Sequence, residues 1–250
     1  YDIGQTIYEK TGVKTYYDGG INMMQIIART QGSHLFDELA AGTKTASETH
    51  FANVDKFNKA ESAISPDLLA EKNPDVVETK PIIDGTTWND FSYSNQYISI
   101  ANTAGRDLGI TMYPTTSDAT TQPMFLKPSQ FFAVSRDAGE NEAEAVKVVN
   151  YLLNSEDANK ILLGERGVPA SSVVASAIAP LQDETAQVVT KYVNDVVTPN
   201  SSAISPAIPD GANEVYDYYN QLVDKILYGQ MTAQEAAEDL FKMGNQIMSR

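Results

Sequence analysis

Residues 128–172 read PSQFFAVSRDAGENEAEAVKVVNYLLNSEDANKILLGERGVPASS, and they decide the fold class that the sequence predicts. Residues 130–135, QFFAVS, form a short apolar run typical of a buried strand. Asn141, with Glu144 three residues later, resembles a capping box that starts a helix. The apolar residues of that helix are Ala145, Val146, Val149, Leu152 and Leu153. A buried strand followed by such a helix favours an α/β protein.

Helical patterns dominate the rest of the chain. Short strands are predicted at 13–17 and 109–114, where β-branched and aromatic residues gather, and within 73–85 between a loop and a turn. Helices are predicted at about 1–12, 21–31, 51–57, 94–105, 182–197, 213–228 and 232–248. The last of these helices opens with a capping box at Thr232 and Glu235. Few, short strands separated by helices indicate an α/β class with crossover connections.

Composition and charge exclude several classes of function. The chain of 250 residues has 33 acidic and 18 basic residues, a formal charge of −15 and a pI near 4.4. This charge repels phosphate backbones and anionic lipids, so neither nucleic acid nor a membrane surface is an expected partner. The sequence contains no cysteine, which excludes disulfides, thiolate nucleophiles and zinc–thiolate sites. No stretch approaches the roughly 20 apolar residues that a membrane-spanning helix needs.

Motifs of catalysis are missing from the sequence. It has no G-x-S-x-G elbow, no phosphate-binding glycine loop and no H-E-x-x-H motif. Its two histidines, His34 and His50, are not spaced as a helical ligand pair, and no acidic loop has calcium-ligand spacing. We therefore expect no enzyme, no metal and no cofactor. Chance carboxylate pairs are plentiful among 33 acids, so a carbohydrate-active enzyme stays open as an alternative.

The stretch WNDFSYSNQY, residues 88–97, carries the clearest binding chemistry. Trp88 and Tyr93 stand beside the side-chain amides and carboxylate of Asn89, Asp90, Asn95 and Gln96. A sugar ring offers one apolar face, which an aromatic ring can cover, and a rim of hydroxyls that need donors and acceptors. The stretch therefore predicts a sugar platform. An alternative remains open, in which Trp88, Phe91 and Tyr97 are core rings and the amides are caps.

The order of several motifs resembles the extracellular solute-binding proteins of bacterial ABC importers, family 1, which are mostly sugar binders. The resemblance rests on the strand and helix of 128–172, with NYLLN at 150–154 and the turn ERGVP at 165–169. The closing helices, YNQLVDKILYGQMTAQEAAEDLFKMGNQIMSR at 219–250, are also similar. PIIDG at 81–85 followed by a ring and SNQ at 94–96 resembles a ligand-facing turn, with Tyr93 where a Trp is common. PDGANE at 209–214 resembles a turn that leads to a Glu.

This resemblance implies a two-lobed, periplasmic-binding-protein-like (type II) fold. Residues 1–122 would be the first part of the C-terminal lobe, and residues 180–250 its closing helices. Residues 123–179 would be a return segment of the N-terminal lobe, entered through the linker TTSDATTQP at 115–123. The first segment of the family, which builds most of the N-terminal lobe, is not matched. We therefore expect the chain to be a fragment that binds sugar weakly by itself.

The predicted function is binding of a carbohydrate, an oligosaccharide, and its delivery to the permease subunits of an ABC importer. The predicted ligand-binding residues are Trp88, Tyr93, Asn95, Tyr17, Asp18, Asp210 and Glu214. Tyr17 and Asp18 follow an expected strand, where ligands sit in open α/β sheets, although a plain turn on DGG explains them equally well. Asp210 and Glu214 could instead cap the next helix, and Arg166 is expected to be structural.

The resemblance also implies a location outside the cell or in the periplasm, with a lipid anchor through a missing N-terminus. A further alternative keeps the transport role but gives it a charged ligand, such as a polyamine or a peptide.

Overall fold

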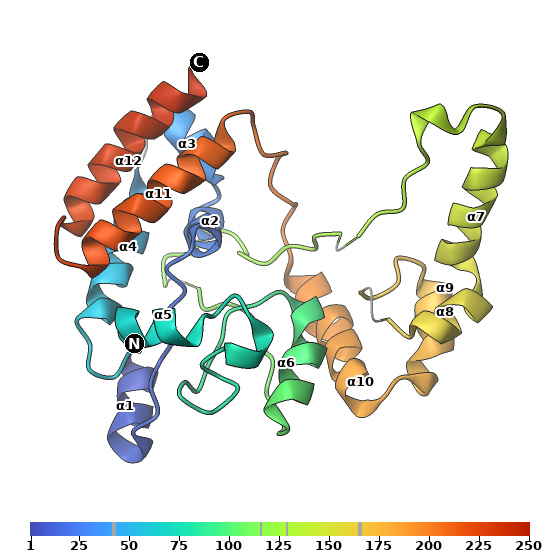
Figure 1. Ribbon diagram of the computed structural model, residues 1–250, viewed down its shortest axis with the longest axis horizontal. Helices are drawn as coiled ribbons and strands as arrows, with labels where there is room; N and C mark the ends of the chain where they lie inside the picture. Colours follow the sequence, from blue (N-terminus) through green and yellow to red (C-terminus); the bar gives the residue numbers. More distant parts are fainter. Residues whose placement is uncertain (42–43, 116, 129, 165–166) are drawn as a thin grey trace. The chain divides into compact units, whose positions relative to one another are not determined.

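The computed structural model of the chain describes residues 1–41, 44–115, 117–128, 130–164 and 167–250, and it is largely helical (Figure 1). The α-helices in these ranges are α1 (Asp2–Thr11), α2 (Ile21–Thr30), α3 (Leu35–Ala41), α4 (Thr45–Asn58), α5 (Pro66–Lys72), α6 (Tyr97–Ala104), α7 (Glu142–Asn154), α8 (Glu156–Leu162), α9 (Ser172–Ile178), α10 (Glu184–Lys191), α11 (Ala212–Leu227) and α12 (Ala233–Met248). A π-helical turn, Tyr192–Val197, continues α10. Among the described residues, no helix is long and apolar enough to cross a membrane.

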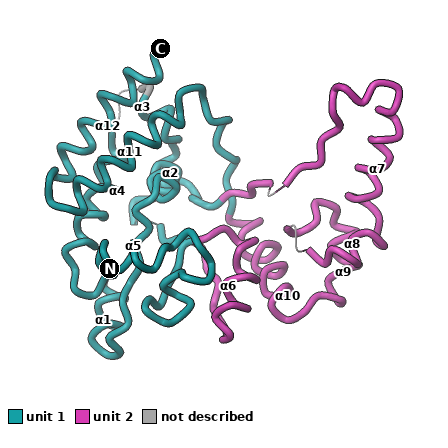
Figure 2. Tube along the Cα trace, viewed as in Figure 1, with its two compact units in different colours: residues 1–91, 113–124, 201–250 teal, residues 92–112, 125–200 magenta. Residues whose placement is uncertain are grey.

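The chain folds into two compact units, shown in two colours in Figure 2. Unit 1 consists of residues 1–91, 113–124 and 201–250, and unit 2 of residues 92–112 and 125–200. The chain passes into unit 2 after Phe91 and again after Met124. Each unit contains buried hydrophobic residues of its own.

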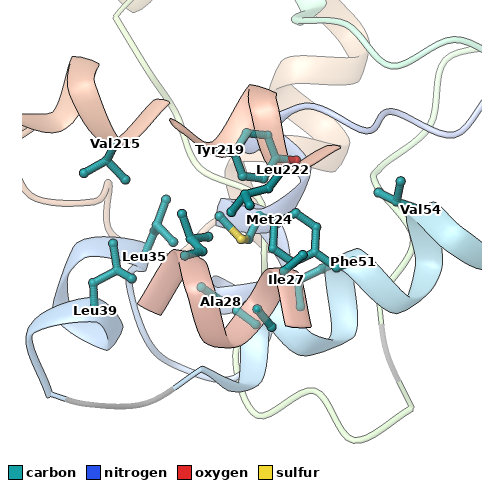
Figure 3. Packing of buried hydrophobic residues seen from close by; sticks show 14 of the residues in the cluster. Met24, Ile27, Ala28, Leu35, Leu39, Phe51, Val54, Val215, Tyr219 and Leu222 are labelled. Carbon is teal, nitrogen blue, oxygen red and sulfur yellow. The ribbon is translucent and has the colours of Figure 1, made fainter. Parts of the chain in front are cut away.

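Unit 1 is built around a bundle of α2, α4, α11 and α12, with α3 against α12. Met24, Phe51 and Tyr219 are fully buried at its centre, where side chains from three of these helices meet (Figure 3). The approach of α12 to α3 is close because position 244 is glycine. A Cβ atom there would lie 3.2 Å from a methyl carbon of Leu39.

Several helix ends are where the sequence predicts them. Thr232 accepts a hydrogen bond from the Glu235 amide at 3.2 Å, and the Glu235 carboxylate accepts one from the Thr232 amide at 2.9 Å. These reciprocal bonds confirm the predicted capping box of α12. Gly12 and Gly105 end α1 and α6 in the left-handed conformation that glycine adopts without strain. At Asn141, in contrast, the predicted box is wrong, because the side chain makes no capping bond at the start of α7.

None of the predicted strands, including the one within 73–85, forms a ladder in the described residues. Of the predicted α/β class, these residues show the helices and two isolated parallel bridges. Residues 130–135 and 109–114 form no ladder, and 13–17 contributes only two isolated bridges. A strand needs a neighbour that supplies hydrogen bonds, and none of the described segments runs beside QFFAVS. Phe131 is accordingly 80% exposed.

Unit 2 has a small core and a large apolar surface. Val174 and Ile178 of α9 are buried, and α10 packs against α6. Helix α7, in contrast, contains no buried residue, although its sequence is amphipathic. Its exposed apolar residues, with those nearby in the chain, include Leu126, Phe131, Phe132, Val146, Val148, Tyr151, Leu153 and Ile161.

Candidate ligand-binding site

Three extended pieces of chain lie side by side in unit 1 and run in the same direction. In the middle piece, Lys14 forms a parallel bridge with Thr87, and Thr15 forms one with Ala63. The carboxyl ends of parallel neighbours meet at one edge, and this edge is where ligands bind in open α/β sheets. We call the residues that follow the middle piece and one neighbour, 16–20 and 88–91, the carboxyl edge.

The side chain of Asn89 extends this small ladder. Its Oδ1 accepts a hydrogen bond from the Tyr16 amide at 2.9 Å, and its Nδ2 donates to the Tyr16 carbonyl at 2.8 Å. Thr87 Oγ1 in turn donates to the Asn89 carbonyl at 3.0 Å. The Asn89 amide therefore joins two chain segments and is not free for a ligand. This agrees with the alternative in which the amides of 88–97 serve structure.

Trp88 presents part of its ring at the carboxyl edge. Its Nε1 donates to Thr15 Oγ1 at 3.0 Å, and its amide donates to the Lys14 carbonyl at 3.1 Å. The polar atom of the indole is thereby occupied, while 41% of the residue stays exposed. The open part of the ring is apolar, which suits contact with the C–H face of a sugar.

Asp18 belongs to a tight turn at the same edge. Its Oδ1 accepts a hydrogen bond from the Gly20 amide at 2.8 Å. A Cβ atom on residue 20 would lie 2.8 Å from that oxygen, so a side chain at this position would displace the Asp18 carboxylate. Burial raises the pKa of the Asp18 carboxyl, and the nearby Asp90 carboxylate adds to the effect. A half-buried carboxylate at the edge is a strong acceptor for hydroxyl or ammonium donors.

Asp90 of the carboxyl edge forms a buried ion pair with Lys80. Lys80 Nζ lies 3.2 Å from both carboxylate oxygens of Asp90, and each side chain is only 7% exposed. Sequence reasoning noted Asp90 but missed Lys80, which stands in a loop without periodicity. An Asp and a Lys separated by ten residues, outside a regular helix, give no sequence signal that they pair.

His50 of α4 is the central residue of a buried polar network that includes Tyr17 and Gly19 of the carboxyl edge. Its Nδ1 lies 3.1 Å from the Tyr17 hydroxyl, and its Nε2 lies 2.6 Å from the Tyr219 hydroxyl and 3.3 Å from the Gly19 carbonyl oxygen. The Tyr219 hydroxyl also donates to the Gly19 carbonyl. A neutral ring protonated on Nε2 gives every group a partner, with Tyr17 donating to Nδ1.

Burial lowers the pKa of His50 to about 4 from an ordinary value of 6.5. Because the folded state binds the proton less tightly than the unfolded state, the stability linked to His50 is fully present above pH 6.5. It is lost as the pH falls from 6.5 through 4. We expect this residue to make the folded state about 2 kcal/mol less stable at about pH 4.5 than at neutral pH.

Urea unfolding at both pH values tests this expectation in wild type, His50→Gln and His34→Gln. The His34 variant removes the other histidine and serves as the comparison, whereas His50→Gln should lose about 2 kcal/mol of the pH dependence. Equal pH dependence in all three proteins would contradict the burial of a neutral His50.

Tyr17 points into unit 1. Its ring stacks on Phe57 with centroids 4.7 Å apart and an interplanar angle of 7°. Its hydroxyl is held by His50, as described above. Stacking and hydrogen bonding thus occupy the groups through which Tyr17 was predicted to bind a ligand.

Asp210 and Glu214 lie at the start of α11, and both are exposed. The residue before the helix is Gly211, so no side chain caps the helix, and the predicted capping role of Asp210 is not seen. Glu214 Oε1 lies 2.8 Å from Arg250 Nη1 in an exposed ion pair. The structure does not bring these two acids to the residues of the carboxyl edge.

Tyr93 and Asn95 belong to unit 2, because the unit boundary falls between Phe91 and Ser92. Both residues are exposed, and the Tyr93 ring has Lys127 Nζ 5.1 Å from its centroid. That cation covers part of the ring by a cation–π contact. The predicted residue Arg166 lies outside the described residues.

No protein-family model matches the chain. Among solved structures, it resembles an extracellular solute-binding protein family 1 from Alicyclobacillus acidocaldarius, with a TM-score of 0.81 and 23% identity. The match covers 100% of this chain and 63% of that one.

Two further structures match nearly the whole chain. A periplasmic oligogalacturonide binding protein from Yersinia enterocolitica, in complex with saturated digalacturonic acid, has a TM-score of 0.65 and 21% identity, over 99% of this chain and 58% of that one. A de novo designed cysteine esterase has a TM-score of 0.74 and 22% identity, over 99% and 63%. This chain therefore spans less than two thirds of each protein, and over its whole length it has the fold of part of an extracellular solute-binding protein.

Proposed function

We propose that the chain is part of an extracellular or periplasmic protein that binds a carbohydrate and delivers it to the permease of an ABC importer, without catalysing a reaction. The single observation that supports this most is the carboxyl edge. There, the half-exposed apolar ring of Trp88 and the half-buried carboxylate of Asp18 follow neighbouring parallel segments. A ring and an acceptor are the two groups that a sugar requires.

The charge of the edge favours a neutral sugar. Asp90 and Asp75 both raise the pKa of Asp18, so the acids repel one another, while the cation of Lys80 is already paired with Asp90. A uronate would add further negative charge beside these carboxylates. We therefore propose a neutral oligosaccharide as ligand, in contrast to the digalacturonic acid bound by the Yersinia protein.

The two-lobed organisation is part of the same proposal. Residues 123–179 would be the return segment of the N-terminal lobe, and 1–122 with 180–250 would form the C-terminal lobe. Support comes from the exposed apolar residues of unit 2, such as Phe131 at 80% and Ile161 at 84%. A segment that normally packs on the rest of a lobe would bury such residues.

Thermal unfolding in the presence of xylotriose, maltotriose, mannotriose, digalacturonate and spermidine tests the proposed function. A neutral trisaccharide is expected to raise Tm by mass action, and digalacturonate is not. Asp18→Asn should weaken binding of that trisaccharide roughly tenfold, as expected for a lost charged hydrogen bond. Asp217→Asn, an exposed change on α11, is the matched control and should bind like wild type.

Two results would overturn the proposal. A shift with spermidine alone would indicate a cationic ligand. Conversion of a trisaccharide to products in proportion to the protein, detected by mass spectrometry, would indicate an enzyme.

A further inference from the structure

A line of polar contacts lies within the hydrophobic cluster of unit 1. His50 is fully buried, as is Tyr219, and their immediate neighbours in α4 and α11 include Phe51, Val54 and Leu222 of the hydrophobic cluster. An apolar side chain at position 50 would fill this space without the cost of burying an imidazole. Something other than packing must therefore favour the histidine.

The contacts of the network all lead to one backbone atom. The Gly19 carbonyl oxygen accepts from the Tyr219 hydroxyl. His50 Nε2 lies 2.6 Å from that hydroxyl oxygen and 3.3 Å from the Gly19 carbonyl oxygen, so a proton on Nε2 is shared between them and groups from two helices fix the direction of the carbonyl. Tyr17, on the other side of the imidazole, donates to Nδ1 and holds the ring in the required tautomer. Both donors to Gly19 are too deeply buried to touch a ligand themselves.

The direction of the Gly19 carbonyl determines where Asp18 points. Gly19 lies between Asp18 and Gly20, whose amide donates to Asp18 Oδ1 at 2.8 Å. If the carbonyl rotates, the following amide rotates with it, because the peptide unit is planar. The hydrogen bond that orients the carboxylate is then lost.

We propose that His50 and Tyr219 are positioning residues for Asp18: by holding the Gly19 carbonyl, they keep the Asp18 carboxylate oriented as the hydroxyl acceptor of the carboxyl edge. This inference rests on the proposed function for its ligand, but its structural part concerns the turn alone. The ring of Tyr219 stacks on Phe51 with centroids 5.5 Å apart, so removing only the hydroxyl leaves the packing in place.

Hydrogen exchange of the Gly20 amide, measured by NMR in the whole chain, tests the structural part. Tyr219→Phe should lower the protection of this amide roughly tenfold, because the turn loses a donor to Gly19. Tyr218→Phe is the matched control: it removes the same atom from the neighbouring residue of α11, where the hydroxyl donates to Asp239 Oδ2 at 2.5 Å. It should leave the protection of Gly20 unchanged.

The trisaccharide that gives the largest Tm shift among xylotriose, maltotriose and mannotriose then tests the link to binding. Its affinity should fall roughly tenfold in Tyr219→Phe, and little further when Asp18→Asn is added, because both changes remove the same acceptor. His50→Gln provides a second variant with the same expected loss of Gly20 protection.

Unchanged Gly20 protection in both Tyr219→Phe and His50→Gln would overturn the inference, and so would fully additive losses of affinity. If none of the three sugars binds wild type, the proposed function fails instead, and Gly20 exchange alone decides whether His50 and Tyr219 position the turn.

Discussion

Replacing Lys80 with methionine is expected to lower the free energy of unfolding by about 3–5 kcal/mol, because it leaves the Asp90 carboxylate buried without its cation. Lys80 Nζ lies 3.2 Å from both Asp90 oxygens, and each side chain is 7% exposed. Water therefore cannot replace the lost partner. Urea unfolding of the whole chain, followed by circular dichroism, measures the loss.

Two further variants make this result specific. Lys72→Met removes the same kind of side chain from the same region, but its partner Asp84 is 50% exposed, so the loss should be much smaller. Lys80→Met combined with Asp90→Leu should recover most of the stability, because a buried pair can often be replaced by apolar residues. A loss for Lys80→Met no larger than for Lys72→Met would contradict the burial of this pair.

The Lys80–Asp90 pair also connects stability to the carboxyl edge. The Lys80 ammonium acts to lower the pKa of Asp18, against the larger effect of burial. Its removal should therefore raise the pKa of Asp18 further and weaken any ligand that needs the ionised carboxylate. The ion pair thus stabilises both the fold and the charge state of the proposed acceptor.

Helices could be predicted from the sequence because their signals are local. Apolar spacing within 213–228 and 232–248 indicates α11 and α12 to within about a residue or two, as helix assignments usually allow. The capping box of α12 lies within four residues. The strand at 130–135 failed because a strand depends on a distant partner, and sequence composition alone does not supply one.

The candidate site was predictable only in part, for the same reason. Trp88 was predicted because an aromatic ring suits a sugar face, and Asp18 because it follows an expected strand; as ligand-binding residues both stay predictions. What each residue contacts could not be read from the sequence: Asn89 bonds to the backbone of a residue 73 positions away, and His50 to Tyr219 169 positions away. The unit boundary between Phe91 and Ser92 also divides a stretch that the sequence presents as one platform.

Arg29 offers the clearest test of these long-range contacts. It lies on α2 and is only 2% exposed. Its guanidinium donates to the carbonyls of Pro123 at 2.8 Å, Met124 at 3.4 Å and Ala203 at 2.8 Å, and to the hydroxyls of Ser202 at 2.6 Å and Ser205 at 2.9 Å. One side chain thereby ties together the two segments at which the chain leaves unit 1, after Met124, and returns to it, at Ser201.

Arg29→Met is expected to cost at least about 2 kcal/mol, because the buried Pro123 carbonyl and the part-buried contact to the Ala203 carbonyl lose their donor at about 1–3 kcal/mol each. Arg29→Lys should recover only part of this loss, since an ammonium cannot reach acceptors on two segments with the planar fork of a guanidinium. Urea unfolding gives the loss, and Arg250→Met, which breaks an exposed ion pair with Glu214, is the control that should change little. If Arg29→Lys were as stable as wild type, charge alone would suffice at this position. A graded order of wild type, Lys and Met would instead show that the fork geometry holds the two connecting segments together.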